Sequence, residues 1–130
     1  MQILPAKNLF QTKQQAKNTD KKILLLLHLQ DCPWCHFVIK EVIEPMIELD
    51  EYSDKLIIRQ IETSENLDMY GFDGAQISND YFALKHKVDF YPTLLLFDAD
   101  GRLLDKVIGV ASKEFYWTEL DKILNKQGVL

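Results

Sequence analysis

Cysteine is scarce in this sequence, and its scarcity excludes one class of protein. The 130 residues contain 2 cysteines, both in the tetrapeptide Cys32-Pro33-Trp34-Cys35. A disulfide-stapled secreted scaffold would instead carry several pairs spread along the chain. Because these cysteines are so close in sequence, a bridge between them closes almost no loop and stabilises the fold little through chain entropy. The pair therefore indicates chemistry rather than structural reinforcement.

Long apolar runs and an excess of positive charge are also missing. The longest apolar stretch, residues 23–27, is far too short to cross a bilayer, so no membrane insertion is expected. The formal net charge is −5, from 15 basic and 20 acidic residues. No stretch gathers Lys and Arg with interleaved aromatic residues, and nucleic acid is therefore not an expected partner. The N-terminus lacks a signal-peptide pattern, so we expect either a cytosolic protein or one whose signal peptide has been removed.

The residues that are present suffice for one conventional core. Hydrophobic residues make up 47% and charged residues 27%, and 7 Phe, 5 Tyr and 2 Trp supply large apolar side chains. This is the balance of an ordinary globular protein. The length predicts a single domain over residues 1–130, with residues 1–20 as an N-terminal helical extension. No internal repeat or low-complexity linker interrupts it.

The pattern of apolar residues predicts an α/β domain with a mixed sheet. Residues 23–29 are apolar almost throughout and are bounded by polar residues, as expected for a central strand buried on both faces. Residues 98–101 carry a hairpin turn signal between two apolar segments. Strands are therefore expected at residues 23–29, 56–61, 93–97 and 102–108.

Helices are expected at residues 8–17, directly after the cysteine motif, at residues 80–86, and near the C-terminus. Pro45 should end or kink the helix that follows the cysteines. Residues 62–79 should be an irregular connection. Ser112 is a candidate cap for the last helix. The inward face of that helix is expected to include Phe115, Leu120, Ile123 and Leu124.

The spacing of the cysteines gives each of them a distinct chemical role. If the buried strand stops just before Cys32, Pro33 occupies the first helical position, where its fixed φ suits the helix and its missing N–H costs nothing. The free N–H groups of Trp34 and Cys35 then point toward the Cys32 sulfur, and they favour thiolate over thiol. Cys32 is therefore the expected nucleophile. Cys35, one turn further in and more buried, is expected to resolve the mixed disulfide.

Two other interpretations of the motif remain open at this point. A zinc site needs further ligands beyond one cysteine pair, and the candidates are His28, His36 and His86. Residues 32–36 also match the C-x-x-C-H pattern of c-type haem attachment. Haem would need an apolar envelope, and it leaves the helix-starting Pro33 without a role. We therefore expect neither a metal nor an organic cofactor, and His36 should be an exposed helix residue.

A second motif makes the pattern more specific. In Tyr91-Pro92-Thr93 the proline stands at the start of an apolar strand, a position compatible with sheet pairing and with a cis peptide in a tight turn. A strand, the cysteine motif, a helix, this proline, a hairpin and a last helix together resemble the thioredoxin superfamily. The resemblance runs from about Lys21 to Leu124. Residues 71–90, with a helix leading to Pro92, look most like the SoxW-type thioredoxin-like proteins of bacteria.

The resemblance implies a thioredoxin fold, a central mixed sheet flanked by helices with the cysteine motif beside a cis-proline loop. Pro92 would be the cis-proline packed against the two sulfurs, and the Tyr91 backbone would pair with an extended substrate segment. Trp34 would be an exposed apolar contact for substrate. Core packing of Trp34 and an ordinary turn at Tyr91 are the alternatives. Because SoxW-type proteins usually act outside the cytoplasm, the resemblance also implies a periplasmic location.

The sequence departs from the thioredoxin pattern at several positions. Asp31 precedes the first cysteine where thioredoxins have Trp, and it would oppose a Cys32 thiolate if its carboxylate pointed inward rather than into water. Pro33-Trp34 replaces Gly-Pro, which is closer to glutaredoxins, although their glutathione-binding Gly-Gly segment is missing. The buried Asp–Lys pair of thioredoxins is replaced by Leu26 and Gln60. Proton transfer from Cys35 then needs water or another group, such as His28 or Glu62.

These observations predict a thiol–disulfide oxidoreductase that reduces protein disulfides through a mixed-disulfide intermediate. Cys32 attacks, Cys35 resolves, and Tyr91 with Pro92 shapes the substrate groove. The expected partners are protein disulfide substrates and a redox partner protein that supplies electrons to a monomer. An oxidase or isomerase of the same fold is an alternative, because the residues between the cysteines tune the potential. A non-catalytic adaptor that binds a partner through the Pro92 groove is another, because fold does not determine function.

Overall fold

The central strand of the protein is the apolar run predicted from the sequence. The computed structural model describes residues 2–130. In strand β2 (Lys22–His28), the five residues from Ile23 to Leu27 are each 1% exposed or less. β2 pairs in parallel with β3 (Leu56–Glu62) and antiparallel with β6 (Thr93–Phe97). A strand buried on both faces needs a helical layer on each side, and the fold provides both.

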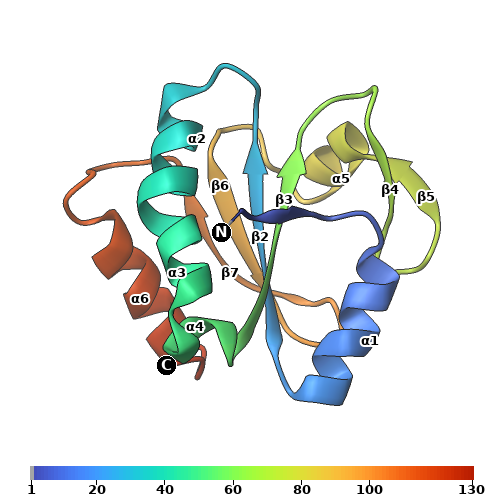
Figure 1. Ribbon diagram of the computed structural model, residues 1–130. Coiled ribbons are helices and arrows are strands. Elements are labelled where there is room, and N and C mark those ends of the chain that lie inside the picture. The colour runs from blue at the N-terminus through green and yellow to red at the C-terminus, as the bar shows by residue number, and fades with distance from the viewer. Residues whose placement is uncertain (1) are drawn as a thin grey trace.

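Two edge strands complete a five-stranded mixed sheet of order β1-β3-β2-β6-β7 (Figure 1). β7 (Leu103–Ile108) is the expected hairpin partner of β6. β1 (Leu4–Pro5) was not predicted, because two residues carry no periodic pattern. It runs parallel to β3, and the Gln60 amide donates to the Ile3 carbonyl at 2.8 Å while the Ala6 N–H donates to the Gln60 carbonyl at 2.8 Å. The predicted α/β class with a mixed sheet is confirmed.

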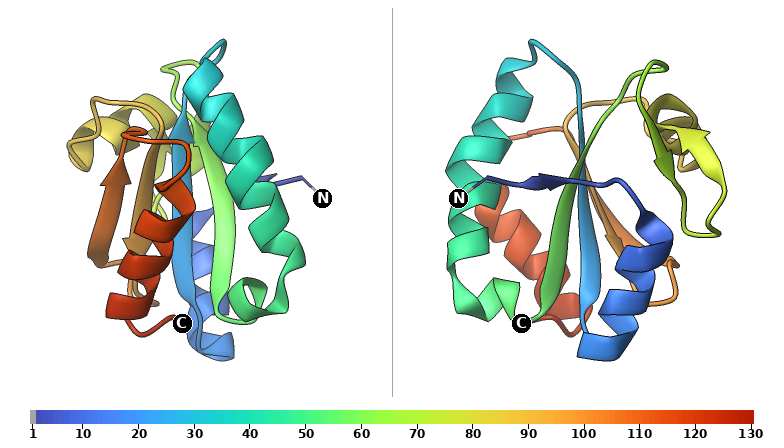
Figure 2. Two further views of the ribbon diagram at one scale, coloured as in Figure 1. Left: turned by 90° about the vertical axis from the view of Figure 1, so that its left-hand side faces the viewer. Right: turned by 45° about the vertical axis from the view of Figure 1, so that its right-hand side comes forward.

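Helices cover both faces of the sheet (Figure 2). Because side chains alternate along β2, they reach both of these layers. Leu24 and Leu26 pack in one cluster and Ile23, Leu25 and Leu27 in the other. Helices from α2 to α4 and α6 line the first cluster, and α1 and α5 line the second. None of the helices in residues 2–130 has the length and apolarity needed to span a membrane. The helical segments are α1 (Leu9–Thr19), α2 (Pro33–Val38), η1 (Ile39–Ile43), α3 (Glu44–Glu48), α4 (Asp50–Ser53), α5 (Asn79–Lys85) and α6 (Tyr116–Lys126).

The helix that follows the cysteines does not end at Pro45. It passes through the π-helical segment η1, in which the Glu44 N–H bonds to the carbonyl of Ile39, and it continues as α3 to Glu48. Proline has no N–H to donate, so an ordinary α-helical ladder would be interrupted at this residue. A π-turn just before the proline shifts the hydrogen-bond pattern and lets the chain remain helical.

The prediction of an irregular connection at residues 62–79 was wrong. The segment contains a two-stranded antiparallel hairpin, β4 (Asp68–Tyr70) and β5 (Gln76–Ser78). The Gly71 N–H donates to the Ala75 carbonyl at 2.9 Å and closes the turn. Met69 anchors the hairpin, because it is 2% exposed and belongs to the core cluster under α1 and α5.

The start of the last helix also differs from the prediction. α6 begins at Tyr116, and its N-cap position, Phe115, makes no side-chain capping bond. The Ser112 hydroxyl bonds to the Glu114 carboxylate at 3.0 Å instead of capping the helix. Phe115 was expected to face the core, yet it is 67% exposed because it lies in the turn before the helix. Leu120 and Leu124 are buried as predicted, and Ile123 packs against the same cluster.

A buried tyrosine ties α4 to α6, and its removal gives a direct test of this packing. The Tyr52 hydroxyl donates to the Asp121 carboxylate at 2.7 Å and accepts from the Trp117 indole N–H at 2.9 Å. Burial and the Asp121 bond raise the pKa of Tyr52 to about 12, so the hydroxyl remains protonated at neutral pH.

Tyr52→Phe should lower the free energy of unfolding by about 1–3 kcal/mol, because both hydrogen bonds are lost and the Trp117 N–H is left unpaired. Urea unfolding followed by circular dichroism measures this loss. Tyr81→Phe is the control, because Tyr81 is 52% exposed. This variant should unfold at the same urea concentration as the parent protein. Equal midpoints for the two variants would contradict a structural role for the Tyr52 hydroxyl.

Candidate active site

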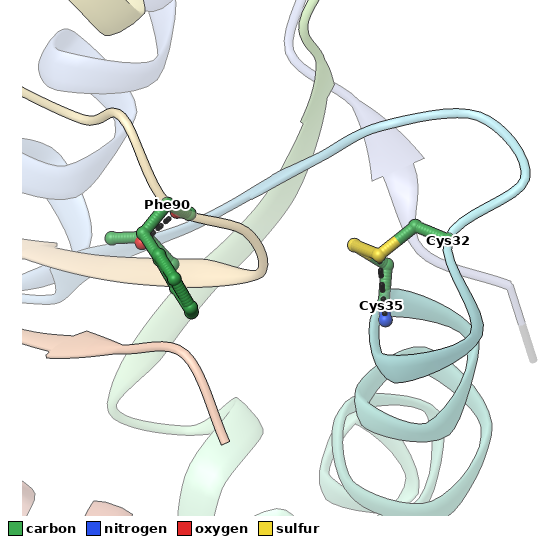
Figure 3. Close-up of a disulfide and its surroundings, with 4 residues drawn as sticks. Cys32, Cys35 and Phe90 are labelled. Carbon is green, nitrogen blue, oxygen red and sulfur yellow. Dashed lines mark hydrogen bonds between the residues drawn. A yellow bond between two sulfur atoms is a disulfide. The ribbon is translucent and has the colours of Figure 1, made fainter. Parts of the chain in front are cut away.

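The cysteine motif lies where the central strand turns into a helix (Figure 3). β2 ends at His28, residues 29–32 form the turn, and Pro33 occupies the first turn of α2 as predicted. Asp31 has a φ of 55°, and this left-handed conformation reverses the chain direction before Cys32. Cys32 itself has an extended backbone and caps the helix. The motif is therefore held by the strand on one side and the helix on the other.

The capping bond acts directly on the sulfur of Cys32. The Cys35 N–H donates to Cys32 Sγ at 3.2 Å, and the His36 N–H donates to the Cys32 carbonyl at 3.0 Å. The Trp34 N–H, the other expected donor, makes no such bond in the described part of the chain. A donor aimed at sulfur at a helix start stabilises the thiolate over the thiol. This geometry suits Cys32 as a nucleophile.

The two cysteines are joined by a disulfide, and they differ in accessibility. Their Cα atoms are 5.2 Å apart. Cys35 is 1% exposed, whereas Cys32 is half-buried, which confirms the predicted order of burial. An incoming molecule can therefore reach Cys32, while Cys35 is shielded by the protein around it.

A cleft of about 540 Å³ opens beside the disulfide. It is formed by the end of β2, the turn, the first residues of α2 and the end of β3. His28 and Glu62 lie side by side as register partners on β2 and β3, and both line the cleft. The lining residues are His28, Leu29, Gln30, Asp31, Cys32, Pro33, Cys35, His36, Ile39 and Glu62.

The charged groups of the cleft differ in their contact with water. Asp31 and His36 are exposed, so the Asp31 carboxylate is solvated rather than held against the sulfur. His28 is half-buried, and its Nε2 atom is shielded from water with no hydrogen-bond partner in residues 2–130. Burial lowers the pKa of His28 below 6.5, although a Leu29 backbone bond, the Glu62 charge and a Gln60 side-chain bond act in the opposite direction. The imidazole is therefore neutral at neutral pH.

The segment around Pro92 reaches the same end of the sheet as the cysteine motif. Thr93 pairs with Leu27 on β2, and the Tyr91–Pro92 peptide bond is cis. The Thr93 hydroxyl donates to the Phe90 carbonyl at 2.6 Å. Pro92 is buried and Tyr91 is half-buried, and neither lines the cleft beside the disulfide. The proline segment and the cleft are thus neighbouring features rather than one cavity.

Trp34 lies at the surface and contacts Lys113, a residue that the sequence analysis did not predict to be near it. Its side chain is 49% exposed, so it is not a core residue. Lys113 Nζ lies 5.4 Å from the centre of the Trp34 ring and 5.3 Å from that of Phe37. Lys113 belongs to the turn before α6, and no local pattern connects it with the cysteine motif. Among residues 2–130, no group of three or more His, Cys, Asp or Glu side chains is arranged to hold a metal ion.

The domain that contains this site matches a known protein family. The sequence model of the thioredoxin-like domain matches residues 9–126, nearly the whole chain. The chain belongs to the thioredoxin-like domain family. The predicted thioredoxin fold is therefore confirmed, with its mixed central sheet and flanking helices. A comparison with curated protein sequences finds no significant match.

Solved thioredoxin structures share this fold at low sequence identity. The thioredoxin of Malassezia sympodialis is 18% identical with a TM-score of 0.64, and the alignment covers 100% of this chain and 96% of that one. The thioredoxin of Fasciola hepatica is 17% identical with a TM-score of 0.62, covering 97% and 98%. Oxidised thioredoxin O2 of Arabidopsis thaliana is 16% identical with a TM-score of 0.60, covering 95% and 92%. The thioredoxin-like fold and the Cys32–Cys35 disulfide together support thiol–disulfide oxidoreductase chemistry.

The loop before Pro92 depends on a glycine in the neighbouring strand end. The Gly109 N–H donates to the Pro92 carbonyl at 2.8 Å, and Gly109 has a φ of 65°. A Cβ atom on Gly109 would lie 2.7 Å and 2.9 Å from two carbon atoms of the Phe90 ring. A side chain at position 109 would therefore collide with the Phe90 ring.

Gly109→Ala should lower the free energy of unfolding by about 2–4 kcal/mol, which adds the clash with Phe90 to the cost of a left-handed backbone. Gly128→Ala is the matched control, because Gly128 also has a positive φ, 76°, but its Cβ would meet nothing within 4 Å. Chemical denaturation of both variants separates the two contributions. An equal loss in both variants would show that Phe90 does not restrict this position.

Proposed function

We propose that the protein reduces disulfides of other proteins through Cys32 and Cys35. The observation that carries this proposal is the contrast between the two cysteines. Cys32 is accessible and receives a hydrogen bond on its sulfur, whereas Cys35 is 1% exposed and lies within bonding distance of it. Such a pair can attack a substrate and then expel it without releasing a free intermediate.

The reaction conserves sulfur atoms and electrons in two exchanges. The Cys32 thiolate attacks one sulfur of a substrate disulfide, so a mixed disulfide forms and the other substrate sulfur leaves as a thiolate. Cys35 then attacks Cys32 Sγ, which releases the second substrate thiolate and leaves the Cys32–Cys35 disulfide. The substrate gains two electrons and the protein loses two. A redox partner protein must reduce the disulfide before the next cycle.

The proposed substrate groove lies between the cysteine turn and the segment around Pro92. Both reach the end of β2, as the pairing of Thr93 with Leu27 requires. The Tyr91 backbone would pair with an extended substrate segment, and the exposed Trp34 would add an apolar contact. The resemblance of residues 71–90 to SoxW-type proteins supports a periplasmic location, and we expect the protein to act there as a monomer on protein substrates.

Substitution of each cysteine tests the order of the two steps. Cys32→Ser should abolish the acceleration of insulin reduction by dithiothreitol, because no accessible thiolate remains. Cys35→Ser should also fail to turn over, but it should accumulate a covalent substrate adduct on Cys32 that is visible by mass spectrometry. Turnover by Cys35→Ser at the parental rate would contradict the two-cysteine mechanism. An adaptor would give no acceleration in any form of the protein.

The reduction potential of the pair decides the direction of electron flow. Equilibration in glutathione buffers, followed by thiol alkylation, should give a midpoint near about −270 mV for a reductase. A midpoint near about −120 mV would identify a disulfide donor of the same fold. The absence of a reversible two-electron transition would contradict the oxidoreductase proposal.

A further inference from the structure

The second exchange needs a proton acceptor for Cys35, if the proposed function holds. Only a thiolate attacks a disulfide, and Cys35 must lose its proton before it can displace the substrate from Cys32. Cys35 is 1% exposed, so bulk water has little access to its thiol. Burial also disfavours an isolated negative charge. The Cys35 N–H assists Cys32 and does nothing for the Cys35 sulfur.

Few groups in the cleft can take this proton. Its titratable residues besides the cysteines are His28, Asp31, His36 and Glu62. Asp31 and His36 are exposed and face water, whereas His28 Nε2 is shielded and has no hydrogen-bond partner within residues 2–130. His28 and the buried Cys35 line the same cleft, so the imidazole is suited to exchange a proton with the thiol through one water.

We propose that His28 accepts the Cys35 proton in the resolving step. The proton moves from Cys35 Sγ through one water to His28 Nε2, the resulting thiolate attacks Cys32 Sγ, and the substrate thiolate leaves. The imidazolium then returns its proton to the leaving thiolate or to water. Glu62 lies beside His28 in register across β2 and β3, and its negative charge stabilises the imidazolium.

The position of His28 also provides an exit for the proton. His28 and Glu62 also line a second cavity of about 430 Å³, together with Lys7, Asp68 and Asn79. His28 therefore borders both the cysteine cleft and this second cavity. The charged and titratable groups that share these two cavities with His28 are Glu62 from β3, Asp31 and His36 in the cysteine cleft, and Lys7 and Asp68 in the second cavity.

The burial of His28 determines the expected pH dependence. Because burial lowers the pKa of His28 below 6.5, the ring is neutral and able to accept a proton at neutral pH. The rate of the resolving step should fall as the pH drops through this pKa, because the imidazolium cannot accept a second proton.

Ellman's reagent separates the two exchanges in one experiment. Attack by Cys32 on this aromatic disulfide releases one coloured thiolate, and resolution by Cys35 releases the second. The coloured thiolate is a good leaving group that needs no proton, so the second phase reports the formation and attack of the Cys35 thiolate. Stopped-flow absorbance of the fully reduced protein at several pH values gives both rates.

His28→Gln should slow the second phase about 100-fold and abolish its levelling above the His28 pKa, so that the rate keeps rising with pH as hydroxide takes the Cys35 proton, while the first phase changes little. His36→Gln is the matched control, because His36 lines the same cleft but is exposed, and both phases should be parental. An unchanged second phase in a folded His28→Gln protein would overturn the proposal and leave the two-cysteine mechanism intact.

Two further outcomes keep the test decisive. If His28→Gln does not fold, the parent protein alone decides, because a second-phase rate that keeps rising with pH above 6.5 instead of levelling off would overturn the role of His28. If the parent protein releases only one coloured thiolate, both this inference and the proposed function fail. These results distinguish an error about His28 from an error about the reaction.

Discussion

The complete burial of β2 is the constraint on which the rest of the structure depends. Its leucines face both helical layers, so neither layer can be removed without exposing apolar surface. The strand also positions the candidate active site, because it ends at His28 and the cysteine turn follows directly after it. The neighbouring strand β6 pairs with β2 up to Thr93, which brings Pro92 to the same end. Core packing and site geometry therefore have one origin.

Within the site, backbone groups do most of the positioning. The sulfur of Cys32 receives its hydrogen bond from an N–H group, and the Pro92 carbonyl is held by the N–H of Gly109. Main-chain donors keep their place when neighbouring side chains change. This is consistent with the comparison to the thioredoxin of Malassezia sympodialis, which shares the fold over the whole length of this chain at 18% sequence identity.

The features predicted correctly from the sequence are those governed by local rules. The run in β2, the proline at the start of α2 and the lower exposure of Cys35 follow from apolar pattern, backbone geometry and helix periodicity. The errors arose where tertiary contacts decide. The β4–β5 hairpin is anchored by Met69 alone on β4, too little for a strand pattern, and Ser112 bonds to Glu114 instead of capping α6. The approach of Lys113 to Trp34 joins residues far apart in sequence, so no motif could indicate it.

The hydrogen bond from the Cys35 N–H to Cys32 Sγ couples the redox equilibrium to folding. The bond favours the thiolate, which exists only in the reduced protein, and it forms only when the turn is folded. Reduction and folding are therefore linked: whatever the bond adds to the stability of the reduced folded protein it also adds to the tendency of the folded protein to stay reduced. Every 1.4 kcal/mol by which this bond favours the reduced folded form corresponds to about 30 mV in the potential of the pair. This backbone donor thus contributes equally to the reduction potential of the pair and to the difference in stability between the two redox forms.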